Sequence, residues 1–137
     1  MIELIEFLQG ELLLTGTLFA LLILLIVNIY SEKFKKYEVV DTNGAVTLMD
    51  EDLIILDVRE EKERSAGFID SDLNIPMGQV KSKLDSLDKS KKILVYCKSG
   101  TRSDRTADLL CKNEFQNVYS LKGGFNAWQK AELPIKK

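Results

Sequence analysis

The apolar residues of this chain form one long run near the N-terminus and several short runs further on. The short runs LIILDV at 53–58 and KKILVYC at 91–97 are nearly continuous and rich in branched side chains. Such runs are typical of strands that are covered on both faces of a parallel sheet. A third run at 118–121 and a β-prone stretch at 37–40 are further strand candidates.

Helix-prone segments alternate with these strands. Apolar residues at Val80, Leu84 and Leu87 recur at helical spacing, and a longer helical pattern occupies 101–115. Short helices are also expected at 45–49, at 60–66 and after Gly124, with a turn at 41–44. Strands that alternate with helices require right-handed crossovers, which give a parallel sheet with helices on both faces. The pattern therefore predicts one α/β domain over residues 37–137, preceded by one apolar helix.

The long apolar run, 12–30, contains no charged residue. At 1.5 Å per residue, a helix over this run spans nearly the ~30 Å hydrocarbon core of a bilayer, so the run predicts a transmembrane helix. A buried core helix or a cleaved signal peptide is the alternative interpretation. A signal peptide begins with basic residues, but residues 1–11 carry glutamates and neither Lys nor Arg, and no A-x-A-like pattern follows the run.

The charges that flank the run predict its orientation. Lys33, Lys35 and Lys36 follow it directly, and basic flanks stay on the cytoplasmic side during insertion. We therefore expect a single-pass protein of the cell (inner) membrane, with residues 1–11 outside, a basic linker at 31–36 and the domain in the cytoplasm. Such an anchor would bring the domain close to membrane-protein partners.

Composition argues against several classes of function. The 137 residues include 19 Lys and Arg against 21 Asp and Glu, so there is no broad basic field for a phosphate backbone. There is no histidine, which is the commonest general base and metal ligand. The two cysteines, Cys97 and Cys111, are too far apart in sequence for a CxxC pair. We expect no metal, no cofactor and no nucleic-acid partner.

Cys97 stands where chemistry is expected in such a sheet, because reactive sites of open α/β sheets lie beyond the carboxyl ends of the strands. The next residues, KSGTR, open a helix, so unpaired backbone N–H groups and the positive end of the helix dipole should gather near the sulfur. Lys98 and Arg102 would add positive charge and favour a thiolate. The alternative interpretation is that Cys97 is only a small core residue. We expect that role for Cys111, because it shares a helix face with Ala107.

Four short motifs occur in an order that resembles the rhodanese family: DVRE at 57–60, NIP at 74–76, CKSGTR at 97–102 and GGFNAW at 123–128. The resemblance covers about residues 37–133. It implies a rhodanese-like fold and a single-domain sulfurtransferase whose loop cysteine takes sulfane sulfur from a donor such as thiosulfate or polysulfide. The resulting persulfide would pass its outer sulfur to a thiol or another thiophilic acceptor, and no histidine is required.

The resemblance also assigns roles to individual residues. Cys97 is the expected nucleophile and sulfur carrier. The loop residues whose N–H groups are expected to surround the terminal sulfur are Lys98, Ser99, Gly100, Thr101 and Arg102. Arg102 is expected to lock the loop by pairing with Asp57, while Arg59 and Lys98 attract anionic donors. A structural ion pair is an equally good interpretation for Asp57 and Arg59.

Two departures from the family pattern leave other functions open. The usual GHIxGAxNIP is replaced by GFIDSDLNIP, with Phe68, Ser71 and Asp72 at the changed positions. Glu63 stands where two-domain rhodaneses carry a thiosulfate-binding arginine, which argues against thiosulfate as the donor. One alternative is therefore a catalytically weak rhodanese-like interaction module at the membrane. Another is a cysteine phosphatase or arsenate reductase, although the phosphatase loop has five residues between cysteine and arginine and this one has four.

Overall fold

The structure is a computed structural model that describes residues 1–33 and 36–137, and it divides near residue 35 into two compact units. The first unit is α1 (Ile2–Lys33), and the side chains of residues 1–30 are all exposed. This helix begins well before the charge-free run, so it includes residues 2–11. Lys35, which belongs to the predicted basic flank and the 31–36 linker, lies outside the described residues.

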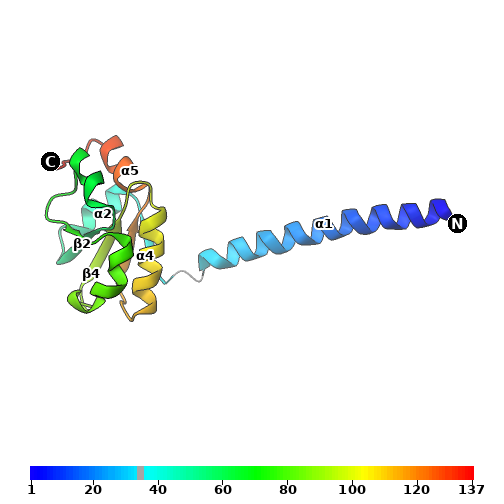
Figure 1. Cartoon of the computed structure of the whole chain (residues 1–137), viewed down its shortest axis with the longest axis horizontal. Helices are drawn as coiled ribbons and strands as arrows, with labels where there is room; N and C mark the ends of the chain where they lie inside the picture. The colour runs from blue at the N-terminus through cyan, green and yellow to red at the C-terminus, as the bar shows by residue number, and fades with distance from the viewer. Residues whose placement is uncertain (34–35) are drawn as a thin grey trace. The chain divides into compact units, whose positions relative to one another are not determined.

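The second unit is built on a parallel sheet of five strands in the order β1-β5-β4-β2-β3. Figure 1 shows two of them, β2 and β4, side by side. The strands are β1 (Glu38–Val40), β2 (Leu53–Asp57), β3 (Leu73–Asn74), β4 (Lys92–Tyr96) and β5 (Val118–Leu121). The two continuous apolar runs are β2 and β4, which pair along their whole length near the middle of the sheet. The predicted parallel sheet is therefore confirmed.

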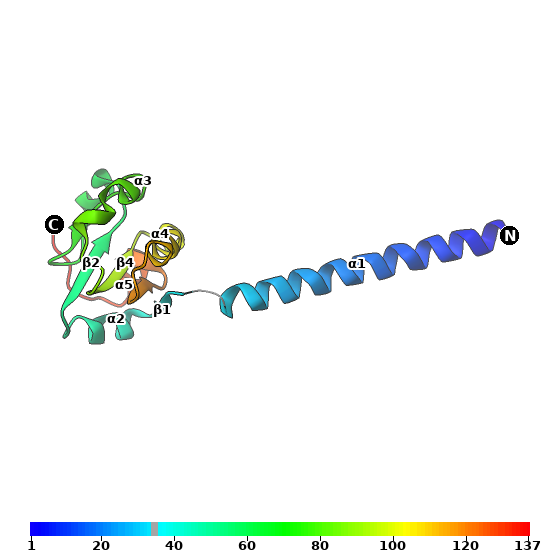
Figure 2. The same ribbon diagram turned by 90° about the horizontal axis from the view of Figure 1, so that it is seen from below.

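Helices cover both faces of this sheet, as predicted. One face carries α3 (Met77–Val80), the 3-10 helix η2 (Lys81–Ser86) and α4 (Thr101–Lys112), while α2 (Thr42–Leu48) and α5 (Gly124–Lys130) pack on the other. Figure 2 shows α3 and α4 on the side of the sheet opposite to α2. Successive residues of a strand point to opposite faces: Ile93 and Val95 join the first core, Leu94 and Tyr96 the second.

The chain enters α2 earlier than the sequence suggested. Residues 41–44 were predicted as a turn, but the helix begins at Thr42 and contains Asn43 and Gly44. Asp41 caps it, and its carboxylate accepts a hydrogen bond from the Gly44 N–H at 2.8 Å. The prediction was wrong because short polar residues that favour turns are also the preferred helix caps.

Another 3-10 helix, η1 (Glu61–Ala66), follows β2 and ends at Gly67, as expected. The segment after it contains the departures from the family pattern. Ser71 replaces the family glycine and has φ 63°, a left-handed conformation that costs an L-residue about 1–2 kcal/mol. Asp70 partly offsets this cost, because its carboxylate accepts the Ser71 N–H at 2.9 Å.

We expect Ser71→Gly to raise the free energy of unfolding by about 0.5–1 kcal/mol, because relief of the left-handed strain exceeds the ~0.4–1 kcal/mol of chain entropy that glycine adds to the unfolded state. Denaturant unfolding of the full chain in detergent would measure the change. Ser82→Gly is the matched control, since Ser82 is exposed in η2 with an ordinary φ, and it should destabilise. Equal losses at both positions would contradict the assignment of strain to Ser71.

Candidate active site

Cys97 follows the last residue of β4 at the carboxyl edge of the sheet, and it is 1% exposed. Its sulfur accepts hydrogen bonds from two backbone N–H groups, that of Gly100 at 3.1 Å and that of Ser103 at 3.4 Å. Both donors belong to the loop and the first turn of α4, where helix N–H groups have no partner within the helix. The sulfur thus lies where backbone dipoles stabilise negative charge.

The orientation of the loop backbone is set by α5. The N–H groups of Phe125 and Asn126 donate to the carbonyls of Cys97 and Lys98 at 2.7 and 3.0 Å. Gly124 makes this approach feasible, because a Cβ at its position would lie 2.4 Å from the Cys97 carbonyl oxygen. Gly124 of the GGFNAW motif is therefore the contact that holds the cysteine loop.

Arg102 locks the loop, but the predicted partner, Asp57, is wrong. The Arg102 guanidinium forms a bidentate pair with Glu63 of η1, with both N···O distances at 2.8 Å. Glu63 also accepts the Glu60 N–H at 2.8 Å and so closes the capping box of η1. The hydrogen bond from Arg102 lowers the pKa of Glu63 to about 2. The acidic residue that binds the arginine therefore comes from the segment after β2, not from its end.

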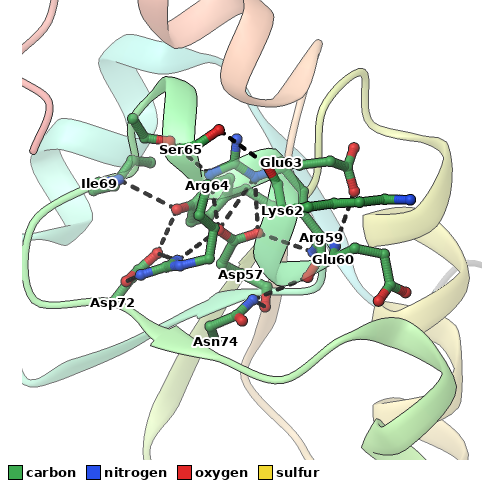
Figure 3. A network of polar contacts seen from close by, with 12 residues as sticks. Asp57, Arg59, Glu60, Lys62, Glu63, Arg64, Ser65, Ile69, Asp72 and Asn74 are labelled. Carbon is green, nitrogen blue, oxygen red and sulfur yellow. Dashed lines mark hydrogen bonds and ion pairs between the residues drawn. The ribbon is translucent and has the colours of Figure 1, made fainter. Parts of the chain in front are cut away.

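Asp57 is already occupied by other groups. Its carboxylate accepts the backbone N–H of Arg59 at 2.9 Å and the Arg59 guanidinium at 2.8–3.1 Å. Both side chains are almost completely buried, and the guanidinium lies 4.3 Å from the Phe125 ring centroid. The Asn74 side-chain amide donates to the carbonyls of Asp57 and Arg59, both at 3.0 Å (Figure 3). Of the two interpretations of Asp57 and Arg59, the structure favours the structural ion pair.

The residues that depart from the family pattern are joined by Arg64. Its Nη1 lies 2.7 Å from the Asp57 carboxylate and 2.6 Å from that of Asp72, and its guanidinium is 4.2 Å from the centre of the Phe68 ring. The Tyr96 hydroxyl also donates to Asp72. Figure 3 shows Arg64 between the two aspartates. Arg64 thus contacts both of the changed residues, Asp72 and Phe68, and its bond to Asp57 ties their loop to the end of β2.

Sequence reasoning missed both Arg64 and Ser103. Arg64 belongs to the segment 60–66, for which the sequence predicted only a short helix. Ser103 lies one residue beyond the CKSGTR motif, yet its N–H is one of the two that reach the sulfur. The signal that could have found Ser103 is its place in the first turn of α4, where N–H groups have no helical partner.

Two cavities adjoin the cysteine loop. A cavity of about 260 Å³ has Lys62, Glu63 and Lys98 in its wall, and one of about 420 Å³ is lined in part by Ser99–Thr101, Asp104, Arg105 and Lys122. Lys62 and Lys98 are exposed and could attract anions to the first cavity. Within residues 1–33 and 36–137, no group of three or more Cys, Asp or Glu side chains is placed to hold a metal ion.

Comparison with known proteins identifies the family. Residues 43–131 match the rhodanese-like domain. The chain belongs to this family. It is 39% identical over 74 residues to the protein YqhL of Bacillus subtilis, a match that covers 54% of this chain and 59% of that one. It is 36% identical over 78 residues to the thiosulfate sulfurtransferase GlpE of Coxiella burnetii, covering 57% and 73% of the two chains.

A solved structure supports the rhodanese-like fold. The rhodanese-related protein of Thermoplasma volcanium matches 73% of this chain and 98% of its own length, with 26% sequence identity and a TM-score of 0.69. The predicted rhodanese-like fold is therefore confirmed.

The Glu63–Arg102 ion pair should make the free energy of unfolding depend on pH in the acidic range. In the folded protein the pKa of Glu63 is lowered to about 2, whereas in the unfolded chain it is near 4.3. The contribution of the ion pair to the free energy of unfolding is therefore fully present above about pH 4.3 and is lost as the pH falls from there through about 2. We expect wild type to be more stable than Glu63→Gln at pH 6, with a gap that narrows progressively below pH 4. Thermal unfolding across this range would measure it. The exposed Glu61→Gln in the same 3-10 helix is the control, and a gap independent of pH would contradict the pairing.

Proposed function

We propose that this chain is a membrane-anchored sulfurtransferase that carries sulfane sulfur as a persulfide on Cys97. Sulfurtransferase activity in the general sense is supported by membership of the rhodanese-like family and by relatives such as GlpE. Such an activity implies a sulfur donor and a thiophilic acceptor. The observation that carries the assignment to Cys97 is the pair of backbone N–H groups, from Gly100 and Ser103, that donate to its sulfur.

The proposed reaction has two displacements at sulfur. The Cys97 thiolate attacks the outer sulfur of thiosulfate or polysulfide, the S–S bond of the donor breaks, and sulfite or a shortened polysulfide leaves with the electron pair. The outer sulfur of the persulfide is then anionic. Backbone N–H groups of the loop, from Lys98 to Arg102, would stabilise it. An acceptor thiolate finally attacks that outer sulfur and regenerates the Cys97 thiolate.

Two features favour sulfur transfer over phosphate chemistry. Only four residues separate Cys97 from Arg102, which gives a smaller ring of N–H groups than a tetrahedral oxyanion needs. In addition, Glu63 binds both Nη atoms of Arg102 and neutralises the guanidinium, whereas a bound phosphate dianion needs that positive charge. A single terminal sulfur makes no such demand on the arginine.

The same ion pair bears on the donor. The negative charge of Glu63 lies in the wall of the 260 Å³ cavity, where it offsets the attraction of Lys62 and Lys98 for a dianion such as thiosulfate. We therefore infer that thiosulfate is a poor donor for this chain, even though the relative GlpE is named for thiosulfate.

Cys97→Ser should abolish sulfur transfer, because a serine hydroxyl cannot form the persulfide. We expect wild type incubated with polysulfide to gain the mass of one sulfur atom on the peptide that contains Cys97, and to lose it when an acceptor thiol is added. Mass spectrometry and a sulfur-transfer assay would measure this. Cys111→Ser is the matched control and should behave as wild type. Equal transfer by wild type and Cys97→Ser would instead favour the interaction module.

The proposed anchor is α1, which is long and apolar enough to cross a bilayer. Its apolar side chains between Leu12 and Tyr30 are exposed, whereas a core helix would bury one side. We propose that it spans the inner membrane with the rhodanese-like domain on the cytoplasmic side, because the positive charges follow the span. A membrane-protein partner would then be within reach of the domain.

We expect the full chain to sediment with membranes, to resist carbonate extraction, and to retain its N-terminal residues. A variant that lacks residues 1–33 should be soluble. Protease added outside spheroplasts should leave the domain intact and digest it only after lysis, as for a cytoplasmic marker protein. Loss of the N-terminal segment from the mature protein would indicate a cleaved signal peptide, and digestion before lysis would reverse the proposed orientation.

A further inference from the structure

A chain of hydroxyl groups connects the Cys97 sulfur to a carboxylate. The sulfur lies 3.6 Å from Oγ of Ser103, which lies 3.0 Å from Oγ of Ser120 in β5, and this oxygen lies 2.6 Å from Oδ1 of Asp104. Ser103 and Ser120 are completely buried, whereas Asp104 is only partly so and lines the 420 Å³ cavity. The chain of groups therefore runs from the buried sulfur to a site that solvent can reach.

A proton must leave the sulfur along some such route whenever loading begins from the Cys97 thiol and not from its thiolate. When loading begins from the thiol, the S–H bond breaks, the donor S–S bond breaks, a new S–S bond forms on Cys97, and sulfite leaves with the electron pair. One proton is released in that step and is taken up again when the acceptor removes the outer sulfur and the thiol reforms. The chain contains no histidine to carry this proton, and Cys97 is 1% exposed.

We propose that Ser103, Ser120 and Asp104 form a proton relay between the Cys97 sulfur and solvent, an inference that rests on the proposed sulfurtransferase function. A hydroxyl can accept one hydrogen bond while it donates another. In the structure the Ser120 hydroxyl is within donating distance of both Ser103 and Asp104. In the relay the thiol donates to Ser103, the Ser103 hydroxyl turns to donate to Ser120, and Ser120 donates to the Asp104 carboxylate. A concerted shift along these bonds leaves a thiolate at one end and a protonated carboxyl at the other, which releases its proton through the cavity.

Rotation of one hydroxyl opens and closes the relay. The Ser103 hydroxyl can also donate to the Gly100 carbonyl, at 2.9 Å, and it has only one proton to donate. Turned toward Gly100 it breaks the chain, and turned toward Ser120 it completes the chain. Tyr37, Arg105 and Lys122 are charged or titratable groups near Asp104, and Arg102 is a charged group near the sulfur.

The relay can be tested by breaking it at two points in the full chain. We expect Ser120→Ala and Asp104→Asn each to slow sulfite release from thiosulfate, or persulfide formation from polysulfide, by about 10²-fold in weak buffer, which is the lower end of the effect of general-base catalysis. The double variant should be no slower than Ser120→Ala, because a broken relay cannot be broken again. Additive losses would overturn the relay and indicate independent structural roles.

Buffer rescue provides a readout that a merely structural role would not change. High concentrations of a small buffer base should restore the rate of Asp104→Asn, since the buffer accepts the proton, and should have little effect on wild type. Asp108→Asn is the matched control: it removes a carboxylate four residues further along α4 whose described ion pair is with Lys112. Its rate should equal that of wild type at every buffer concentration. Absence of rescue would count against the relay.

A packing defect at Ser120 could also slow the reaction, and the variants Ser120→Thr and Ser120→Val distinguish that effect from loss of the hydroxyl. The two new side chains have nearly the same shape and differ in the hydroxyl. The threonine variant should be much faster than the valine variant, and equal rates would overturn the relay.

The outcome for the relay is distinct from the outcome for the function. If wild type and Asp108→Asn form no persulfide, the sulfurtransferase proposal itself fails, whereas a wild-type rate in Ser120→Ala rejects the relay alone.

Discussion

The geometry of the site depends on the direction in which the cysteine loop points its backbone groups. The carbonyls of Cys97 and Lys98 are taken by the first N–H groups of α5, and the N–H groups of Gly100 and Ser103 are thereby left to face the sulfur. Neither half of this arrangement holds without the other, because a backbone carbonyl that lost its partner would compete for the same donors. The contact between Gly124 and the Cys97 carbonyl is thus as important to the site as the loop itself.

Around this loop the buried guanidinium of Arg59 and two half-buried guanidinium groups each have a carboxylate partner. Arg59 binds Asp57, Arg64 bridges Asp57 and Asp72, and Arg102 binds Glu63. Paired in this way, the arginines hold β2, the segment after it and α4 in register, and little of their charge is available to a ligand. The charge that an anionic donor meets comes instead from exposed lysines, which discriminate less between anions because an ammonium group makes no bidentate contact.

The sequence allowed most of the fold and the place of Cys97 to be predicted, because both follow from local patterns. LIILDV and KKILVYC are typical of central parallel strands, and a cysteine directly after such a strand lies at the carboxyl edge. The partner of Arg102 could not be predicted, since several carboxylates follow β2 and only the 3-10 helix brings Glu63 to it. The compensation of Phe68 and Asp72 by Arg64 likewise depends on a loop path that no periodicity encodes.

The lack of histidine constrains the chemistry more than any residue that is present. Without an imidazole, a buried thiol must be activated by fixed dipoles and must exchange its proton through weaker groups. Backbone N–H groups can stabilise the anion, but they cannot carry a proton away, so the two tasks fall to different parts of the site. In this fold they meet at Ser103, whose N–H donates to the sulfur while its hydroxyl leads toward Ser120 and Asp104. A single residue at the start of α4 therefore links charge stabilisation to proton exchange.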